Sequence, residues 1–324
     1  FNDPYNGGSH QADVVVASPM FLQKRLIGFA VNRGHWVDVG GMAPGGWSGT
    51  ARHVIQEALI IPPVKLYKAG NLDREIRDFI LKNVRLPKQC WGDIQAQIAS
   101  NIVAERRVSA LIHKYGIKMV QEGMEEALNY SRKRFHNMLE ALPDGAWEGT
   151  DYQEDDGHGG GPHKIHVKLT KSGKKVTLDF TGSSPQVRGP VNCTFTETKA
   201  GCYTALMNVV DPWVPLNSGS IEGIKVVAPL GCIVNPTYPA PVFSSTSDPL
   251  NKVYEAVMKA MSCWLPDRVT AGSYCTMNNC TASGDLDESG EEFIWYHFGP
   301  GGIGARLTKD GRNGDCHAMT NART

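Results

Sequence analysis

Two histidines and an aspartate near the start of the chain have the residue types of a metal site. His10 and Asp13 form a His-x-x-Asp pair directly before an apolar run, and His35 follows the next apolar run. Imidazole nitrogens and carboxylate oxygens bind divalent cations, and three protein ligands leave one position open for water or substrate. The pattern therefore predicts a catalytic site with one divalent metal ion at His10, Asp13 and His35. Zinc and manganese both suit these ligands.

The two apolar runs are expected to bring these residues together. Residues 14–32 have the composition of two buried strands, with a polar turn centred on Lys24 between them. An antiparallel hairpin with this turn places Asp13 directly opposite His35. The glycine-rich turn that contains His10 can bring its imidazole to the same point. In the alternative interpretation these residues are turn formers and hydrogen-bonded loop residues around a strand pair, and spacing alone leaves both interpretations open.

Two further aspartates are candidates for roles beside these three residues. Asp38 comes three residues after His35, and Asp3 lies in the turn-rich segment before His10. Each is predicted to be a further ligand or a hydrogen-bond partner that orients a ligating imidazole. We count Asp38 among the catalytic candidates.

A second histidine-rich segment lies in the middle of the chain. His158, His163 and His166 stand near Asp155 and Asp156, which resembles a metal cluster in composition. The glycines between them are more typical of a surface loop, and we favour that interpretation.

Glycine-rich segments at residues 40–46 and 299–304 do not have the features of a nucleotide site. Neither ends in the Gly-Lys-Ser/Thr of a phosphate loop, so tight turns are the simpler interpretation. We therefore expect no ATP site on this chain. The backbone N–H groups of both segments are instead expected to line the metal site and to face a developing oxyanion.

The remaining sequence predicts helices and strands in irregular order. Two apolar stripes at helical spacing are expected to be core. Helices are predicted over residues 71–83 with Asn71 as the N-cap, 93–116, 120–143, 199–210 and 250–264. A second hairpin is predicted over residues 164–180, and single strands are predicted over residues 224–229 and 293–298. The fold class is therefore α+β, with mixed strands and helices in one large domain over residues 1–324.

Composition excludes several classes of partner. The chain of 324 residues has 33 basic and 33 acidic residues, so its formal net charge is zero and no nucleic-acid or anionic-membrane surface is expected. No apolar run approaches the ~20 residues of a membrane-spanning helix. The eight cysteines form no Cys-x-x-Cys pair, which indicates reduced thiols in a cytoplasmic protein. The chain starts inside a motif, so we expect it to be an internal portion of a longer polypeptide.

Several segments of the chain are similar to those of one known family. They are NDPYNGGSHQADVVVASPMF, GHWVDVGGMAPGG, IPPVKLYKAGNLD, GDIQAQIASN, LDFTGSSPQVRGPVN, VVAPLGCIVNP and TMNN. In this order, along nearly the whole chain, they resemble the hydantoinase B/oxoprolinase family, which implies a hydantoinase B-like fold. One departure is at His35-Trp36, where many hydantoinases have a His-His pair and acetone carboxylases differ again, so the substrate stays open.

The resemblance implies a role in an ATP-dependent hetero-oligomer. ATP binds to a hydantoinase A-type subunit, and the small-molecule substrate is a cyclic amide such as hydantoin, N-methylhydantoin or 5-oxoproline, or else acetone or acetophenone. In such ketone carboxylases a divalent metal lies at positions that correspond to His10, Asp13 and His35. We therefore expect a metal-containing subunit of an ATP-dependent amidohydrolase. The alternatives are a ketone carboxylase subunit and a non-catalytic scaffold without a metal.

Overall fold

The computed structural model describes residues 1–287 and 290–319, and these fall into two compact units. Unit 1 consists of Phe1–Ser48, Ile55–Glu125 and Thr281–Trp295, and unit 2 of Gly49–Val54, Glu126–Cys280 and Tyr296–Thr324. Both units contain helices and strands, which confirms the α+β class. The assignment of residues 1–324 to one domain of a longer chain stays a prediction.

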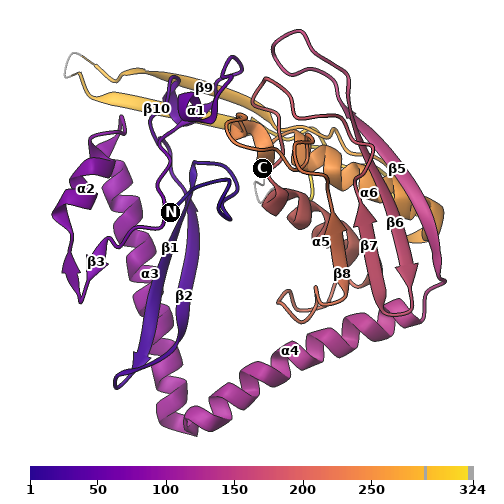
Figure 1. The fold of residues 1–324 in the computed structure, drawn as a ribbon, viewed down its shortest axis with the longest axis horizontal. Helices are drawn as coiled ribbons and strands as arrows, with labels where there is room; N and C mark the ends of the chain where they lie inside the picture. Colours follow the sequence, from indigo (N-terminus) through magenta and orange to yellow (C-terminus); the bar gives the residue numbers. More distant parts are fainter. Residues whose placement is uncertain (288–289, 320–324) are drawn as a thin grey trace. The chain divides into compact units, whose positions relative to one another are not determined.

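Unit 1 is built on a hairpin of two long strands. β1 (Asp13–Leu22) pairs antiparallel with β2 (Arg25–His35), and helix α3 (Pro87–Tyr115) packs along one face of the pair (Figure 1). The smaller elements of this part of the chain are η1 (Pro44–Gly46), α1 (Val54–Glu57), β3 (Tyr67–Lys68), β4 (Asn71–Leu72) and α2 (Arg74–Leu81).

The register of the hairpin depends on a β-bulge. The turn consists of Gln23 and Lys24, because Leu22 pairs with Arg25. A regular ladder from this turn would place Asp13 opposite Gly34. Between the Phe21–Leu26 and Met20–Gly28 pairs, however, β2 carries Ile27 as one extra residue, and the register shifts by one. Asp13 therefore pairs with His35, as predicted.

Two of the predictions for this unit were wrong. The strands are not buried on both sides, since α3 covers one face and Phe29 and Val31 on the other are 58% and 60% exposed. Asn71 is not the N-cap of α2 but pairs in β4. The cap is Asp73, whose carboxylate accepts from the backbone N–H groups of Glu75 and Ile76, because it lies one residue before the first helical turn.

Unit 2 contains a four-stranded sheet and two buried helices. The strand order is β5 (Gly145–Gln153), β6 (His163–Ser172), β7 (Lys175–Asp179) and β8 (Ile224–Val227), with β8 parallel to β7 and the other pairs antiparallel. Helices α5 (Phe195–Val210) and α6 (Pro249–Trp264) pack against each other, and α6 also packs on β5 and β6 (Figure 1). The inward residues of the predicted second hairpin, such as Val167 and Leu178, are fully buried.

The core of unit 2 includes only part of the long helix α4 (Ile117–Glu140). Phe135 and Leu139 near its end are fully buried, whereas Met124 is 50% exposed. On α3, likewise, Ile102 is 42% exposed. The prediction that both apolar stripes are core was therefore wrong in part. Helix α4 extends beyond the core of unit 2, and the buried face of α3 includes the polar residues Gln97 and Asn101 while Ile102 lies outside it.

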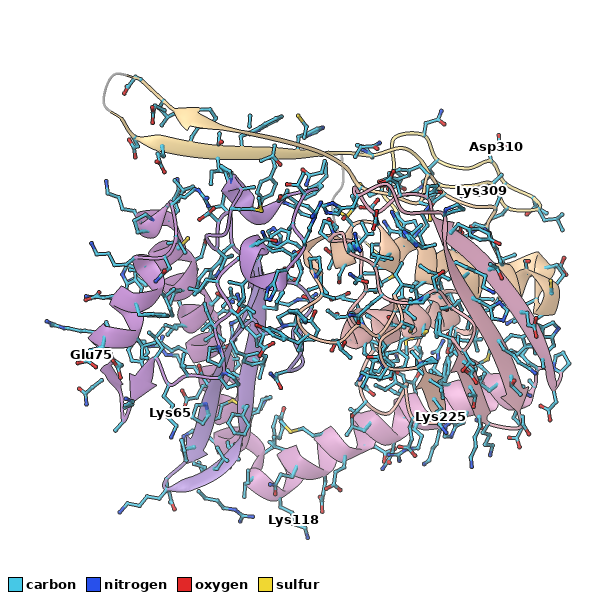
Figure 2. The ribbon with its side chains drawn as sticks, turned by 45° about the horizontal axis from the view of Figure 1, so that its top comes forward. Lys65, Glu75, Lys118, Lys225, Lys309 and Asp310 are labelled. Atoms are coloured by element: carbon cyan, nitrogen blue, oxygen red, sulfur yellow. The ribbon has the colours of Figure 1, made fainter. Side chains whose placement is uncertain are left out.

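The remaining elements are short helices and one more strand pair. η2 (Phe243–Thr246) and η3 (Pro266–Arg268) flank α6, and β9 (Asn278–Asp285) pairs with β10 (Glu292–Gly299). Figure 2 labels six exposed charged residues whose side chains point away from the ribbon: Lys65, Glu75, Lys118, Lys225, Lys309 and Asp310. Within the described ranges, every helix falls short of the length or the apolarity that a bilayer span requires.

Candidate metal centre

The hairpin and the turn before it bring His10, Asp13 and His35 together. Asp13 Oδ1 lies 3.0 Å from His35 Nδ1, and Asp13 Oδ2 lies 3.5 Å from His10 Nδ1. The centroids of the two imidazole rings are 5.1 Å apart. One ligand atom from each residue lies within 4.8 Å of the others. Donors that share one ion at ~2.1 Å in tetrahedral geometry are about 3.4 Å apart, so the spacing of this group fits a single divalent ion.

A tight turn carries His10 to the start of β1. The backbone N–H of Gly8 donates to Asp3 O at 2.8 Å, and a Cβ at Gly8 would lie 2.6 Å from the same oxygen. The N–H of Asp13 then donates to His10 O at 3.1 Å. Because no larger residue fits at Gly8, the glycine sets the path that places His10 beside Asp13.

Burial and charge give two of the three residues the protonation states that a cation needs. His10 is 2% exposed, and burial lowers its pKa to about 4, although Asp13 acts in the opposite direction. Burial alone would raise the pKa of Asp13. The hydrogen bond with His35 and the charges of His10 and Arg33 outweigh it and hold that pKa well below its usual range. Near neutral pH, His10 is therefore neutral and Asp13 is ionised, as metal ligands must be.

The metal-free protein is expected to lose stability as the pH falls from about 6.5 towards 4. The pKa of His10 is 6.5 in the unfolded chain and about 4 in the folded chain, so the unfolded state binds more protons in this window. Protons then favour unfolding, and the free energy of unfolding falls by up to about 3 kcal/mol. Urea unfolding with a chelator at several pH values measures the slope. His10→Gln should flatten it, and an unchanged slope would contradict the assignment.

Asp38 does not belong to this group, because loop amides and an arginine use its carboxylate. It is fully buried. Its Oδ2 accepts from the N–H groups of Gly40 at 3.0 Å and Arg85 at 2.8 Å, and its Oδ1 accepts from Gly45 N–H at 3.1 Å and Arg85 Nη1 at 3.0 Å. Asp38 thus orders the loop after β2. The amides of Gly40 and Gly45 point to this carboxylate, so they are not the predicted oxyanion donors.

Asp3 also has a local role. Its Oδ1 accepts from the N–H of Tyr5 at 2.9 Å, and its Oδ2 accepts from Asn6 Nδ2 at 2.5 Å. These bonds close the turn that precedes His10, so Asp3 supports the position of that residue through the backbone.

Amide side chains on α3 fix the hairpin next to Asp13 and His35. Gln97 Nε2 donates to Val14 O at 2.8 Å, and its Oε1 accepts from Trp36 Nε1 at 3.0 Å. Trp36 is 2% exposed, so this side chain packs against the helix and is not a ligand. Gln97 therefore anchors the start of β1 and the residue after His35 at the same point.

A second amide continues the same contact along the hairpin. Asn101 Nδ2 donates to Val16 O at 3.2 Å, and its Oδ1 accepts from Asn32 Nδ2 at 2.8 Å. Asn32 Nδ2 also donates to Gln97 O at 2.8 Å. Neither amide was predicted to have a role, although their spacing of four residues on one helix face is the signal that could have identified them.

The histidine-rich segment of unit 2 forms a loop and a strand start. Asp156 Oδ1 accepts from the N–H groups of His158 and Gly160 at 2.9 and 3.0 Å, and His166 Nδ1 lies 3.0 Å from Thr150 Oγ1. Among the described residues, these side chains do not make a three-ligand group.

The chain matches a family model over its whole length and is similar to a known caprolactamase subunit. Residues 1–324 match the model of a family described as Hydantoinase B/oxoprolinase. The chain is 30% identical over 313 residues to the caprolactamase subunit beta of Pseudomonas jessenii, which covers 96% of this chain and 54% of that protein.

Two solved structures have a similar fold. The crystal structure of ATP-dependent caprolactamase from Pseudomonas jessenii matches with a TM-score of 0.89 at 29% identity, over 98% of this chain and 55% of that one. The nucleotide-free structure of acetone carboxylase matches with a TM-score of 0.85 at 20% identity, over 98% of this chain and 44% of that one, and shows the fold alone. The chain spans about half the length of these relatives.

Proposed function

The chain belongs to the hydantoinase B/oxoprolinase family, and from this premise we propose that it is part of the metal-containing subunit of an ATP-dependent amidohydrolase that opens a cyclic amide. The observation that carries the proposal is the group of His10, Asp13 and His35. It combines two imidazoles and a carboxylate at the spacing of ligands to one ion, with His10 neutral and Asp13 ionised. Zinc and manganese are the ions we propose.

The site has one accessible side, and we propose that the substrate enters there. The side chain of His35 is 32% exposed, whereas those of His10 and Asp13 are 3% and 11% exposed. Ser9 Oγ donates to Asp13 Oδ2 at 2.8 Å and holds the carboxylate from the buried side. A bound divalent ion would supply Lewis acidity for the amide carbonyl and for water. All three residues would hold the ion, and His35 is the ligand on the accessible side, where the substrate would approach.

Arg33 adds a positive charge next to this opening. Its Nε lies 3.4 Å from Asp13 Oδ2, and its side chain is 54% exposed. We propose that this guanidinium attracts a negatively charged group on an activated substrate, since charged groups at an entrance steer ligands of opposite charge.

ATP is proposed to act on a hydantoinase A-type partner subunit in a hetero-oligomer. An unactivated amide is a poor electrophile, and transfer of a phosphoryl group to its carbonyl oxygen would create a leaving group. The relative named ATP-dependent caprolactamase supports this coupling, because it combines ATP use with a cyclic amide and has a subunit similar to this chain. We propose the cytoplasm as the location and expect no nucleotide site on this chain itself.

Turnover by the reconstituted complex tests the proposal. The full-length protein and its partner subunit receive ATP with either a cyclic amide (hydantoin, 5-oxoproline or caprolactam) or a ketone plus bicarbonate. We expect ADP release together with ring opening of one of the amides, and loss of both after chelation. Turnover of a ketone with bicarbonate, but of none of the amides, would favour the carboxylase alternative. A complex without metal and without either activity would favour the scaffold.

A further inference from the structure

Unit 2 holds a second group of metal-ligating side chains, from three segments that are far apart in the sequence. Glu255 lies in α6, Cys275 lies in the loop before β9, and His317 lies near the end of the described chain. They are 6%, 8% and 1% exposed, and one ligand atom from each lies within 4.8 Å of the others. We propose that Glu255, Cys275 and His317 form a second metal site, with zinc as its ion.

The imidazole of His317 is directed at this point without a satisfactory partner. Its Nε2 is buried and makes no hydrogen bond within the described ranges. Glu255 Oε1 is 3.4 Å away, so the two atoms are close but poorly aligned for a hydrogen bond. The ring is held edge-on against Tyr254, with the centroids 4.9 Å apart. A buried polar atom of this kind usually has a partner, and a cation between His317 and Glu255 would provide one.

The other two ligands are held by one serine. Glu255 Oε1 accepts from the N–H of Ser273 at 3.1 Å and from its Oγ at 2.9 Å. The N–H of Cys275 donates to Ser273 Oγ at 3.3 Å. Cys275 itself has a φ of 58°, a left-handed conformation that is uncommon for a residue with a side chain and persists only where the surroundings fix it. Ser273 is thus placed as ligand-orienting residues are in known metal sites.

The donor set selects the class of cation. Thiolate, imidazole and carboxylate together suit zinc, whereas magnesium and calcium prefer ligand sets of oxygen. Burial raises the pKa of the Cys275 thiol to about 12, so without an ion the thiol is neutral. Zinc would displace this proton to solvent, and the thiolate and the Glu255 carboxylate would then balance its two positive charges.

Metal binding at this second site would change the hydrogen bonding of His317. His317 Nδ1 accepts from the N–H of Met319 at 3.2 Å, so in the absence of an ion the ring proton is on Nε2. Coordination through Nε2 moves that proton to Nδ1 and ends the contact with Met319. Glu255 and His317 also line a cavity of about 710 Å³, which gives an ion a path of entry and leaves a fourth position open.

Cobalt(II) distinguishes the two sites, because only the second contains sulfur. A cobalt–thiolate bond gives a near-ultraviolet charge-transfer band that imidazole and carboxylate ligands do not give. Metal-free full-length protein is titrated with cobalt(II) and followed by absorption. We expect this band in the natural protein. Cys275→Ser should lose the band and should bind one equivalent of cobalt less than the natural protein. His35→Ala should lose the equivalent bound at His10, Asp13 and His35 and should keep the band. The titration therefore tests the second site separately from the proposed function.

Cys263→Ser is the matched control, because Cys263 is an exposed thiol of the same unit and should keep band and stoichiometry. Circular dichroism checks that the variants fold. If Cys275→Ser does not fold, Glu255→Gln takes its place and should require at least tenfold more cobalt for the same band. The proposal is wrong if the natural protein has no band, if the band survives in folded Cys275→Ser, or if Glu255→Gln titrates unchanged.

Discussion

His35→Ala is expected to abolish turnover and metal binding at His10, Asp13 and His35 while the protein still folds. The substitution removes one of three ligands, so metal affinity should fall by more than the 10–100-fold that is typical when a residue behind the ligands is changed. The hairpin should survive, because His35 is the last residue of β2 and its side chain is 32% exposed. Elemental analysis, turnover and thermal unfolding of the complex measure the three effects.

His113→Ala is the control for this variant. His113 is an exposed histidine in the last turn of α3, so its loss should leave metal content and turnover unchanged. If His35→Ala instead keeps full metal and full activity, His35 is a structural loop residue. The site would then have to be rebuilt around His10 with other partners.

Gln97→Leu is expected to destabilise unit 1 by about 2–4 kcal/mol. Leucine has a similar size but no amide. Trp36 Nε1 and Val14 O therefore each lose a buried hydrogen-bond partner, and the half-buried side chain of Asn32 loses one as well. Because the same contacts hold Val14 next to Asp13 and Trp36 next to His35, metal affinity should fall 10–100-fold. Urea unfolding and metal titration of the full-length protein measure the two quantities.

Gln95→Leu gives the matched comparison on the same helix. Gln95 is exposed on α3, and surface substitutions of this kind usually change stability by less than about 0.5 kcal/mol. Equal stability of the two leucine variants would show that the amide network does not hold the hairpin.

The proximity of His10, Asp13 and His35 could be predicted from the sequence because the geometry of this group is local. His10 and Asp13 are separated by one turn, and a single hairpin connects Asp13 to His35, so pairing rules alone bring them together. The predicted pairing of Asp13 with His35 is confirmed, although the predicted turn centred on Lys24 was one residue longer than the observed one. The observed turn of two residues and the one extra residue in the bulge together give the same register as the predicted turn of three residues.

Other features lay beyond sequence reasoning because they depend on contacts between distant segments. Hydrophobic periodicity found the long helix α3 but not the function of Gln97, since a polar residue on an apolar face gives no indication of its partners. Strand β5 was missed because GAWEGTDYQ contains two glycines and polar residues, and its burial against α6 compensates for them. Glu255, Cys275 and His317 have no spacing that marks a site, and only the fold of unit 2 brings them together.

Because of the bulge at Ile27, the pairing of Asp13 with His35 depends on the number of residues in each strand near the hairpin tip. Eight pairs separate the shift from the ligands, Met20 to Asp13, so a change in residue number near the tip acts about 23 Å away. Loss of one residue from β2 alone would turn the His35 side chain to the opposite face of the hairpin. Adding one residue to each strand would leave the alignment of Asp13 and His35 intact. Length changes at this tip are therefore compatible with a working site only when they come in balanced pairs.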